Sequence, residues 1–244
     1  MNFTGWEWCI AALGAILVGI SKTGITGLSL LFVALFAAIM PAKQSTGFVL
    51  PLLILGDLIA FALYRGHAVL SHVWRLLPWA AGGVVIGFFA LGRMNEHQTQ
   101  VAIGAIVVSL TVLHVGRRTG ALPADLALPP WFAWMIGILA GFTSLVANAS
   151  GPLMVVYLLA MRLPKMEFMG TGAVFFLLMN LFKFPFMAGL SLVNPASLML
   201  NLMLVPGVVL GTILGRWLLG RIDQRLFENI ALGLTLVAGA RMFI

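Results

Sequence analysis

Apolar runs long enough to cross a lipid bilayer follow one another along this chain. A transmembrane helix needs about 20 predominantly apolar residues, and several runs reach that length. Charged residues make up 9% of the 244 residues, whereas soluble domains average about 25%. We therefore expect an all-α polytopic membrane protein with lipid as a partner. No polar stretch is long enough for a nucleotide-binding domain, which excludes ATP-driven pumping within this chain.

Short polar connectors divide the sequence into eight apolar segments, and the first and fifth are interrupted by polar residues. The longest connector begins at Gly116 and ends at Pro130. We expect a first repeat in residues 1–118, a linker in 119–130 and a second repeat in 131–244. The expected segments cover residues 8–40, 46–64, 74–91 and a fourth ending near 115, then 131–161, 167–187, 197–219 and 226–243.

The second half of the sequence repeats the first. A proline, three glycines and an arginine recur at an offset of 128 residues: Pro78, Gly83, Gly87, Gly92 and Arg93 match Pro206, Gly211, Gly215, Gly220 and Arg221. A second set recurs at an offset of 123: Pro41, Gly47, Asp57 and Gly66 match Pro164, Gly170, Asn180 and Gly189. Glycines four residues apart let helices approach closely, so we interpret Gly83, Gly87, Gly211 and Gly215 as packing residues. The pattern predicts two homologous repeats.

The basic residues distinguish two arrangements of these repeats. If the interrupted segments cross the membrane, seven flanking lysines and arginines lie on one side and five on the other. If they are re-entrant hairpins, each repeat has three crossings and the repeats are inverted. The counts are then nine (Arg65, Arg75, Arg117, Arg118, Arg162, Lys165, Arg216, Arg221 and Arg225) against three (Lys43, Arg93 and Arg241). Because basic residues concentrate on the cytoplasmic side, we favour inverted topology with both termini outside, although kinked spans remain an alternative to hairpins.

The two interruptions are expected to form an anion-binding site. Residues 19–27 place a lysine, three hydroxyl groups and three glycines in an apolar segment, and we expect the helix to break twice there. Residues 143–152 interrupt the fifth segment. A half-helix that begins inside the membrane presents free N–H groups and a positive dipole end to an anion, and Pro152 suits a first turn. The expected substrate-binding residues are Ser21, Lys22, Thr23, Gly24 and Gly27 in the first break and Asn148, Ser150 and Gly151 in the second.

Three further polar residues lie in apolar segments and extend this site. Asn180 and Lys183 share one helix face because they are three residues apart, and Asp57 is the repeat mate of Asn180. Ionisable groups in lipid mark functional sites or pair with one another. We assign Asn180 and Lys183 to substrate binding and Asp57 to a counter-ion or coupling role. A structural ion pair, with Lys22 reaching toward an interface, is the alternative.

Other chemistries find little support in the sequence. Cys9 is the single cysteine, which excludes a disulfide and a cysteine-based metal site. His67, His72, His97 and His114 are scattered without metal-ligand spacing. The net charge of +7 lies mostly at segment ends, where it is typical of membrane topology and headgroup contact and not of nucleic-acid binding. We expect no metal, no cofactor and no enzymatic activity.

The motifs also resemble those of the TauE/SafE-type sulfite exporter family. In the first half they are Gly19-Ile20-Ser21-Lys22-Thr23-Gly24 with Gly27, Asp57 with Tyr64-Arg65, and Leu77-Pro78 with Gly83 and Gly87. In the second half they are Gly151-Pro152, Tyr157-Leu158, Gly170-Thr171, Asn180 with Lys183, and Pro206 with Gly211 and Gly215. The resemblance implies a secondary carrier of sulfite, sulfoacetate or other organosulfur anions in a bacterial inner membrane.

Together the residues and the resemblance predict a secondary transporter of small sulfur-containing anions that exports by alternating access between the two broken helices. An uptake carrier for another organic anion, such as a carboxylate, and an anion channel are the alternatives. The sequence leaves open the anion, the direction, the coupling to protons and the formation of a homodimer.

Overall fold

The computed structural model describes residues 4–25, 28–90, 130–230 and 233, and this part of the chain contains helices and no strands. The first half comprises α1 (Gly5–Thr23), α2 (Ser29–Ile39), α3 (Ala42–Tyr64), the short 3₁₀ helix η1 (Arg65–His67) and α4 (Leu70–Ala90). The second half comprises α6 (Pro130–Ala147), α7 (Gly151–Ala160), α8 (Lys165–Gly189) and α9 (Pro195–Arg221).

The expected long segments correspond to α3, α4, α8 and α9, each with ends within about four residues of the prediction. Within the described ranges, five helices are long and apolar enough to cross a membrane: α1, α3 with η1, α4, α8 and α9. The multi-pass helical class is therefore confirmed. The fourth expected segment, all of the eighth except residues 226–230 and 233, and most of the linker lie outside the described residues.

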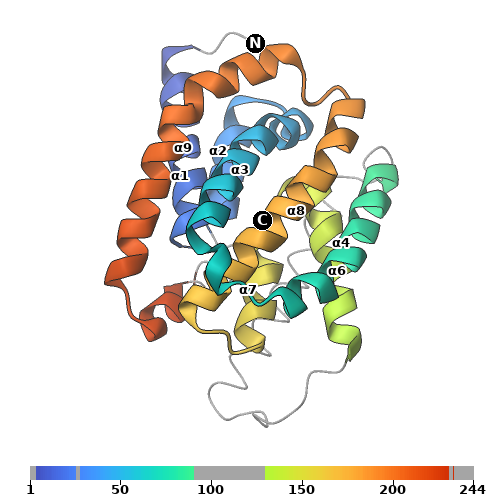
Figure 1. Cartoon of the computed structure of the whole chain (residues 1–244). Helices are drawn as coiled ribbons and strands as arrows, with labels where there is room; N and C mark the ends of the chain where they lie inside the picture. The colour runs from blue at the N-terminus through green and yellow to red at the C-terminus, as the bar shows by residue number, and fades with distance from the viewer. Residues whose placement is uncertain (1–3, 26–27, 91–129, 231–232, 234–244) are drawn as a thin grey trace.

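The helices form three adjoining pairs (Figure 1). The helix α1 packs against α9, α4 packs against α6, and α3 packs against α8 between these outer pairs. Each outer pair therefore joins a helix of the first half to one of the second. In the view of Figure 1, α3 runs downward and α8 upward, while α4 runs upward and α9 downward.

Glycines make the two outer contacts possible. A methyl group at Gly211 would overlap the carbonyl of Ile16, and one at Gly83 would overlap the carbonyl of Ile138. Gly83 and Gly211 are 128 residues apart, and Ile16 and Ile138 are 122 apart. The same helix contact therefore occurs in both outer pairs, and the interpretation of these glycines as packing residues is confirmed.

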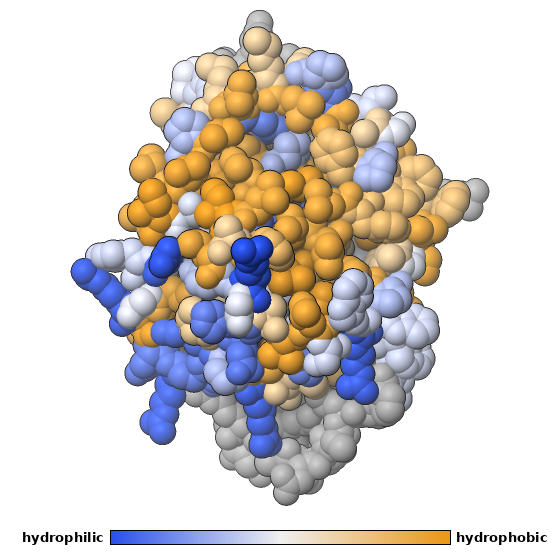
Figure 2. All heavy atoms as spheres, in the orientation of Figure 1, coloured by the Kyte–Doolittle hydropathy of each residue, from blue (hydrophilic) through white to orange (hydrophobic). Residues whose placement is uncertain are grey.

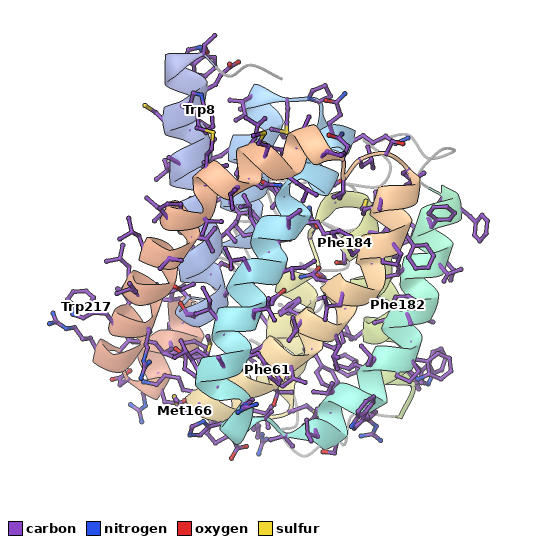
Figure 3. The ribbon with its side chains drawn as sticks, turned by 45° about the horizontal axis from the view of Figure 1, so that its top comes forward. Trp8, Phe61, Met166, Phe182, Phe184 and Trp217 are labelled. Atoms are coloured by element: carbon purple, nitrogen blue, oxygen red, sulfur yellow. The ribbon has the colours of Figure 1, made fainter. Side chains whose placement is uncertain are left out.

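The surface divides into an apolar region and a polar end. Hydrophobic side chains cover the middle and upper part of the face in Figure 2, and hydrophilic ones gather over its lower part. Large apolar side chains such as Phe89 on α4 and Met199 on α9 are exposed, as expected for surfaces that contact lipid. Near the polar end, Trp217 points away from α9 (Figure 3), and the Arg221 guanidinium lies 3.8 Å from its ring centre.

Candidate functional site

The first break lies between Thr23 and Ser29. The helix α1 continues through Gly19 and Ser21 to Thr23, so the prediction of two breaks in residues 19–27 is wrong. Gly19 lies within α1 and allows a close contact with α9, because a methyl group there would overlap the carbonyl of Val208. Position 24 also faces α9, since a methyl group there would overlap Gly215.

Two hydrogen bonds fix the end of α1. The phenol of Tyr64 donates to the carbonyl oxygen of Thr23 over 2.7 Å, which satisfies a carbonyl left free where the helix stops. The Thr23 hydroxyl donates to the carbonyl oxygen of Thr212 on α9 over 2.8 Å. A side chain of α3 and a backbone carbonyl of α9 therefore hold the break in place.

The second break comprises residues 148–150. The helix α6 ends at Ala147, and Asn148 adopts a left-handed backbone conformation with φ of 51°. The backbone then turns into α7, which begins at Gly151 with a proline in its first turn, as predicted. Thr143 and Ser144 belong to the last turns of α6, so the predicted interruption begins five residues too early.

The half-helices α2 and α7 begin beside each other. A methyl group at Gly151 would lie 2.5 Å from the hydroxyl oxygen of Ser29. Each N-terminus carries free N–H groups and a partial positive charge. The Ser29 side chain is only 7% exposed, and its hydroxyl has no hydrogen-bond partner among the described residues. Two helix N-termini and an unpartnered hydroxyl thus meet at one place.

A buried ion pair lies next to these N-termini. The ammonium of Lys22 is 2.7 Å from one carboxylate oxygen of Asp57, which is fully buried on α3. The amide of Asn180 donates to the other oxygen over 2.6 Å. Lys22 also lies over the ring of Phe176, with 4.6 Å between its ammonium and the ring centre. The interpretation of Lys22 and Asp57 as an ion pair therefore matches the geometry, and a substrate role for Lys22 stays a prediction.

The second lysine of the site, Lys183, has uncharged partners. Its fully buried ammonium donates to the side-chain oxygen of Asn148 over 2.6 Å, to the carbonyl oxygen of Ser144 over 3.1 Å and to the Ser144 hydroxyl over 3.2 Å. The amide nitrogen of Asn148 in turn donates to the carbonyl oxygen of Thr46 over 3.0 Å. In the described chain no carboxylate lies within ion-pair distance of Lys183.

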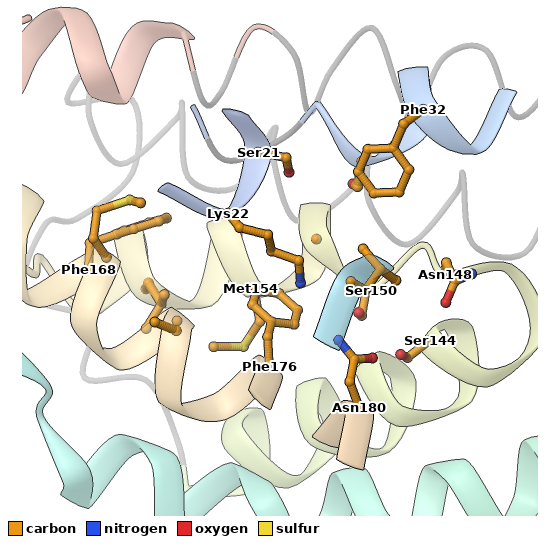
Figure 4. Close-up of a pocket in the computed structure, with 17 residues that line it drawn as sticks. Ser21, Lys22, Phe32, Ser144, Asn148, Ser150, Met154, Phe168, Phe176 and Asn180 are labelled. Carbon is orange, nitrogen blue, oxygen red and sulfur yellow. The ribbon is translucent and has the colours of Figure 1, made fainter. Parts of the chain in front are cut away.

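A cavity of about 40 Å³ lies between these groups (Figure 4). A single water needs roughly 10–15 Å³ of such space, so the cavity has room for a few water-sized groups. Phe32, Met154, Phe168 and Phe176 form much of its apolar wall. Its polar lining consists of Ser21, Lys22, Ser29, Ser144, Asn148, Ser150, Gly151 and Asn180.

The structure separates the predicted site residues into two groups. Six line the cavity: Ser21, Lys22, Asn148, Ser150, Gly151 and Asn180. Thr23, Gly24, Asp57 and Lys183 do not line it, although Asp57 and Lys183 each bond a residue that does. Gly27 lies outside the described residues. In the residues that the structure describes, no group of three His, Cys, Asp or Glu side chains is placed to hold a metal ion.

Sequence reasoning missed Ser29 and Ser144 as lining residues. The predicted first break covers residues 19–27, so Ser29 falls inside the half-helix that follows it and does not stand out. The repeat contained the missing signal, because Ser29 lies 122 residues before Gly151, the offset that also relates Ile16 to Ile138. Applied to the second helix start, this offset identifies Ser29 directly.

Broken apolar helices that meet beside buried charged residues are typical of one class, the multi-pass membrane transporters. The chain matches the family described as Sulfite exporter TauE/SafE over residues 11–242. That match covers nearly the whole sequence, and the protein belongs to this family. Its family and its apolar helices make it a multi-pass membrane protein, consistent with a bacterial inner membrane. No curated protein and no solved structure matches the chain.

Proposed function

We propose that the protein is a secondary transporter that exports a small sulfur-containing anion, sulfite or an organosulfonate, and binds it between the N-termini of α2 and α7. The observation that carries this proposal is the meeting of those two N-termini at a cavity where the buried hydroxyl of Ser29 lacks a partner in the described chain. A buried donor without an acceptor costs free energy, and an anion supplies the acceptor.

The donors around the cavity suit an oxyanion. Sulfite and sulfonate groups carry three oxygen atoms, each able to accept more than one hydrogen bond. The N–H groups of two helix starts, the hydroxyls of Ser29 and Ser150 and the ammonium of Lys22 surround the same cavity. Helix N-termini bind anions through free N–H groups and the dipole, and Lys22 adds a full charge.

We further propose that the two halves are inverted repeats. Opposite running directions of α3 and α8, and of α4 and α9, support this topology. The lower ends of the helices in Figure 1 carry Arg65 in η1, Lys165 at the start of α8 and Arg221 at the end of α9, as the positive-inside rule requires of one side. Inverted repeats with broken helices are a recurrent transporter plan.

The lengths of the half-helices support a site near mid-membrane. The 11 residues of α2 and 10 of α7 span about 15–17 Å at 1.5 Å per residue, roughly half of a 30 Å hydrocarbon core. The helix α2 packs against α1, and α7 against α6, which supports a helical hairpin at each break. Rocking of one hairpin against the other would open the cavity to alternate sides.

Sulfite flux in proteoliposomes tests this function. Lys22→Ala and Ser29→Ala should each lower the rate, by roughly 10-fold or more for the lysine and several-fold for the serine, since charged hydrogen bonds are worth about twice neutral ones. Lys43→Ala and Ser71→Ala alter exposed residues of the same types and serve as controls. Unchanged flux in both site variants would remove these residues from the site.

The same vesicles separate the alternatives. A carrier shows faster efflux when unlabelled substrate is present on the opposite side, and a channel does not. Competition by unlabelled acetate but not by methanesulfonate would instead support the carboxylate carrier.

A further inference from the structure

We propose that this site selects oxyanions that carry a single negative charge, and that Asp57 sets this preference. The inference rests on the proposed transport function and specifies the charge of its substrate. It favours hydrogensulfite and simple sulfonates over doubly charged sulfite, sulfate and sulfoacetate.

The buried charged side chains of the described chain give the site a net formal charge of +1, to which the two helix N-termini add only partial charges. Asp57 and Lys183 are buried, and the Lys22 side chain is 10% exposed. The contact of 2.7 Å between Lys22 and Asp57 balances one positive charge with one negative charge. Among the described residues, Lys183 has no carboxylate within ion-pair distance. One positive charge therefore remains without a counter-charge.

The contacts of Lys183 fit the charged ammonium form. An ammonium has three N–H donors, and three oxygen atoms of Ser144 and Asn148 lie within 3.2 Å of this nitrogen. The orientation of the Asn148 amide is fixed at its other end, because its nitrogen donates to the carbonyl of Thr46. The oxygen of the Asn148 amide therefore faces Lys183, where it accepts a hydrogen bond.

An anion with one negative charge balances the net formal charge of the side chains around the site. Ser144 and Asn148 both line the cavity and both bond Lys183, so a bound anion lies one residue away from the uncompensated charge. A dianion leaves one negative charge unbalanced, and burying an unpaired charge is costly. The same lysine pair would balance a dianion only if Asp57 lost its charge.

Sulfamate and sulfate provide matched probes, because they are similar tetrahedral oxyanions with one and two negative charges at neutral pH. We expect purified protein to bind sulfamate more tightly than sulfate by roughly 10-fold or more, the scale of one unbalanced charge in a partly screened site. Isothermal titration calorimetry at constant ionic strength measures both affinities.

Two variants separate the effect of the site's net charge from the effect of losing a direct contact with the anion. Asp57→Asn raises the net formal charge of the site's side chains to +2, and the preference should reverse toward sulfate. The double variant Lys22→Met with Asp57→Asn restores a net formal charge of +1. It should therefore prefer sulfamate again, even though its affinity for both anions falls. Melting temperatures of both variants establish that the protein remains folded.

The outcomes distinguish failure of this inference from failure of the proposed transport function on which it rests. Equal affinity of the unmodified protein for sulfamate and sulfate, with sulfite flux intact, overturns the charge preference and leaves the transport function standing. Absence of flux and of binding for every oxyanion overturns both. Reversal in folded Asp57→Asn supports the inference, and an unchanged preference there overturns the role of Asp57.

Discussion

The two helix breaks share a backbone arrangement but take their positive charge from different helices. In the first break, Lys22 lies in the last turn of α1, within the broken segment itself. The residue 122 positions later is Ser144. In the second break, the charge comes from Lys183 on α8, whose counterpart 123 positions earlier is Ala60. The two breaks thus have similar helix ends, whereas their charged residues occupy different positions.

This difference assigns separate roles to backbone and side chains. The repeated N-termini of α2 and α7 provide donors for any oxyanion. In our proposal, the unequal charges decide which anion is balanced, and they already determine that Asp57 pairs with Lys22. At the centre, equivalent residues contact each other across the halves: Asp57 bonds Asn180, and Ser29 lies against Gly151. A mutation at one member of such a pair should therefore affect both halves.

The proposed inverted topology, in which the two breaks enter the membrane from opposite sides, gives an all-or-none prediction. In a Cys9→Ser background, a cysteine replacing Lys43 should react with a membrane-impermeant maleimide on intact cells. Cysteines replacing Arg65 or Arg225 should react only after the membrane is permeabilised, because these residues lie at the end expected to face the cytoplasm. Reaction of all three positions from outside would contradict the inverted arrangement.

Lys183→Met should have the next largest effect. It removes the second positive charge and leaves oxygens of Asn148 and Ser144 without a donor, at a cost of about 1–3 kcal/mol for each unsatisfied group. Sulfite transport should fall at least as far as in Lys22→Met, although Lys183 does not line the cavity. Lys43→Met is the matched control. Near-normal flux in Lys183→Met would show that one lysine suffices.

Glycine substitutions compare the two outer helix pairs. Gly83→Ala and Gly211→Ala each place a methyl group against a backbone carbonyl and should lower stability by similar amounts, about 1–3 kcal/mol. Gly82→Ala meets no atom within 4 Å and should stabilise α4 by up to about 1 kcal/mol. Thermal unfolding in detergent measures all three. A large loss for one glycine and none for the other would show that the contacts are not equivalent.

The sequence predicted what depends on local composition. Long apolar runs placed α3, α4, α8 and α9, and the paired glycines identified the helix contacts. It placed the start of the first break several residues too early, because a glycine needed for helix packing and a glycine at a helix end look alike in sequence. Gly19 is of the first kind, and only the neighbouring Val208 carbonyl on α9 shows this.

Part of the site could also be predicted from local composition. Lys22, Asp57, Asn148 and Asn180 stand out because polar residues in apolar segments need partners. Ser29 did not stand out, since a serine costs little in a helix, and its importance comes from meeting Gly151 across the fold. The partners of Lys183 likewise depend on how α6 and α8 pack.

The central claim is that the anion binds between the starts of α2 and α7. A density map of the protein with sulfite in a lipid nanodisc tests this most directly. We predict anion density within hydrogen-bond distance of the Ser29 hydroxyl and the backbone N–H groups that open α7, with Lys22 beside it. Anion density elsewhere, with this cavity holding only water, would contradict the account.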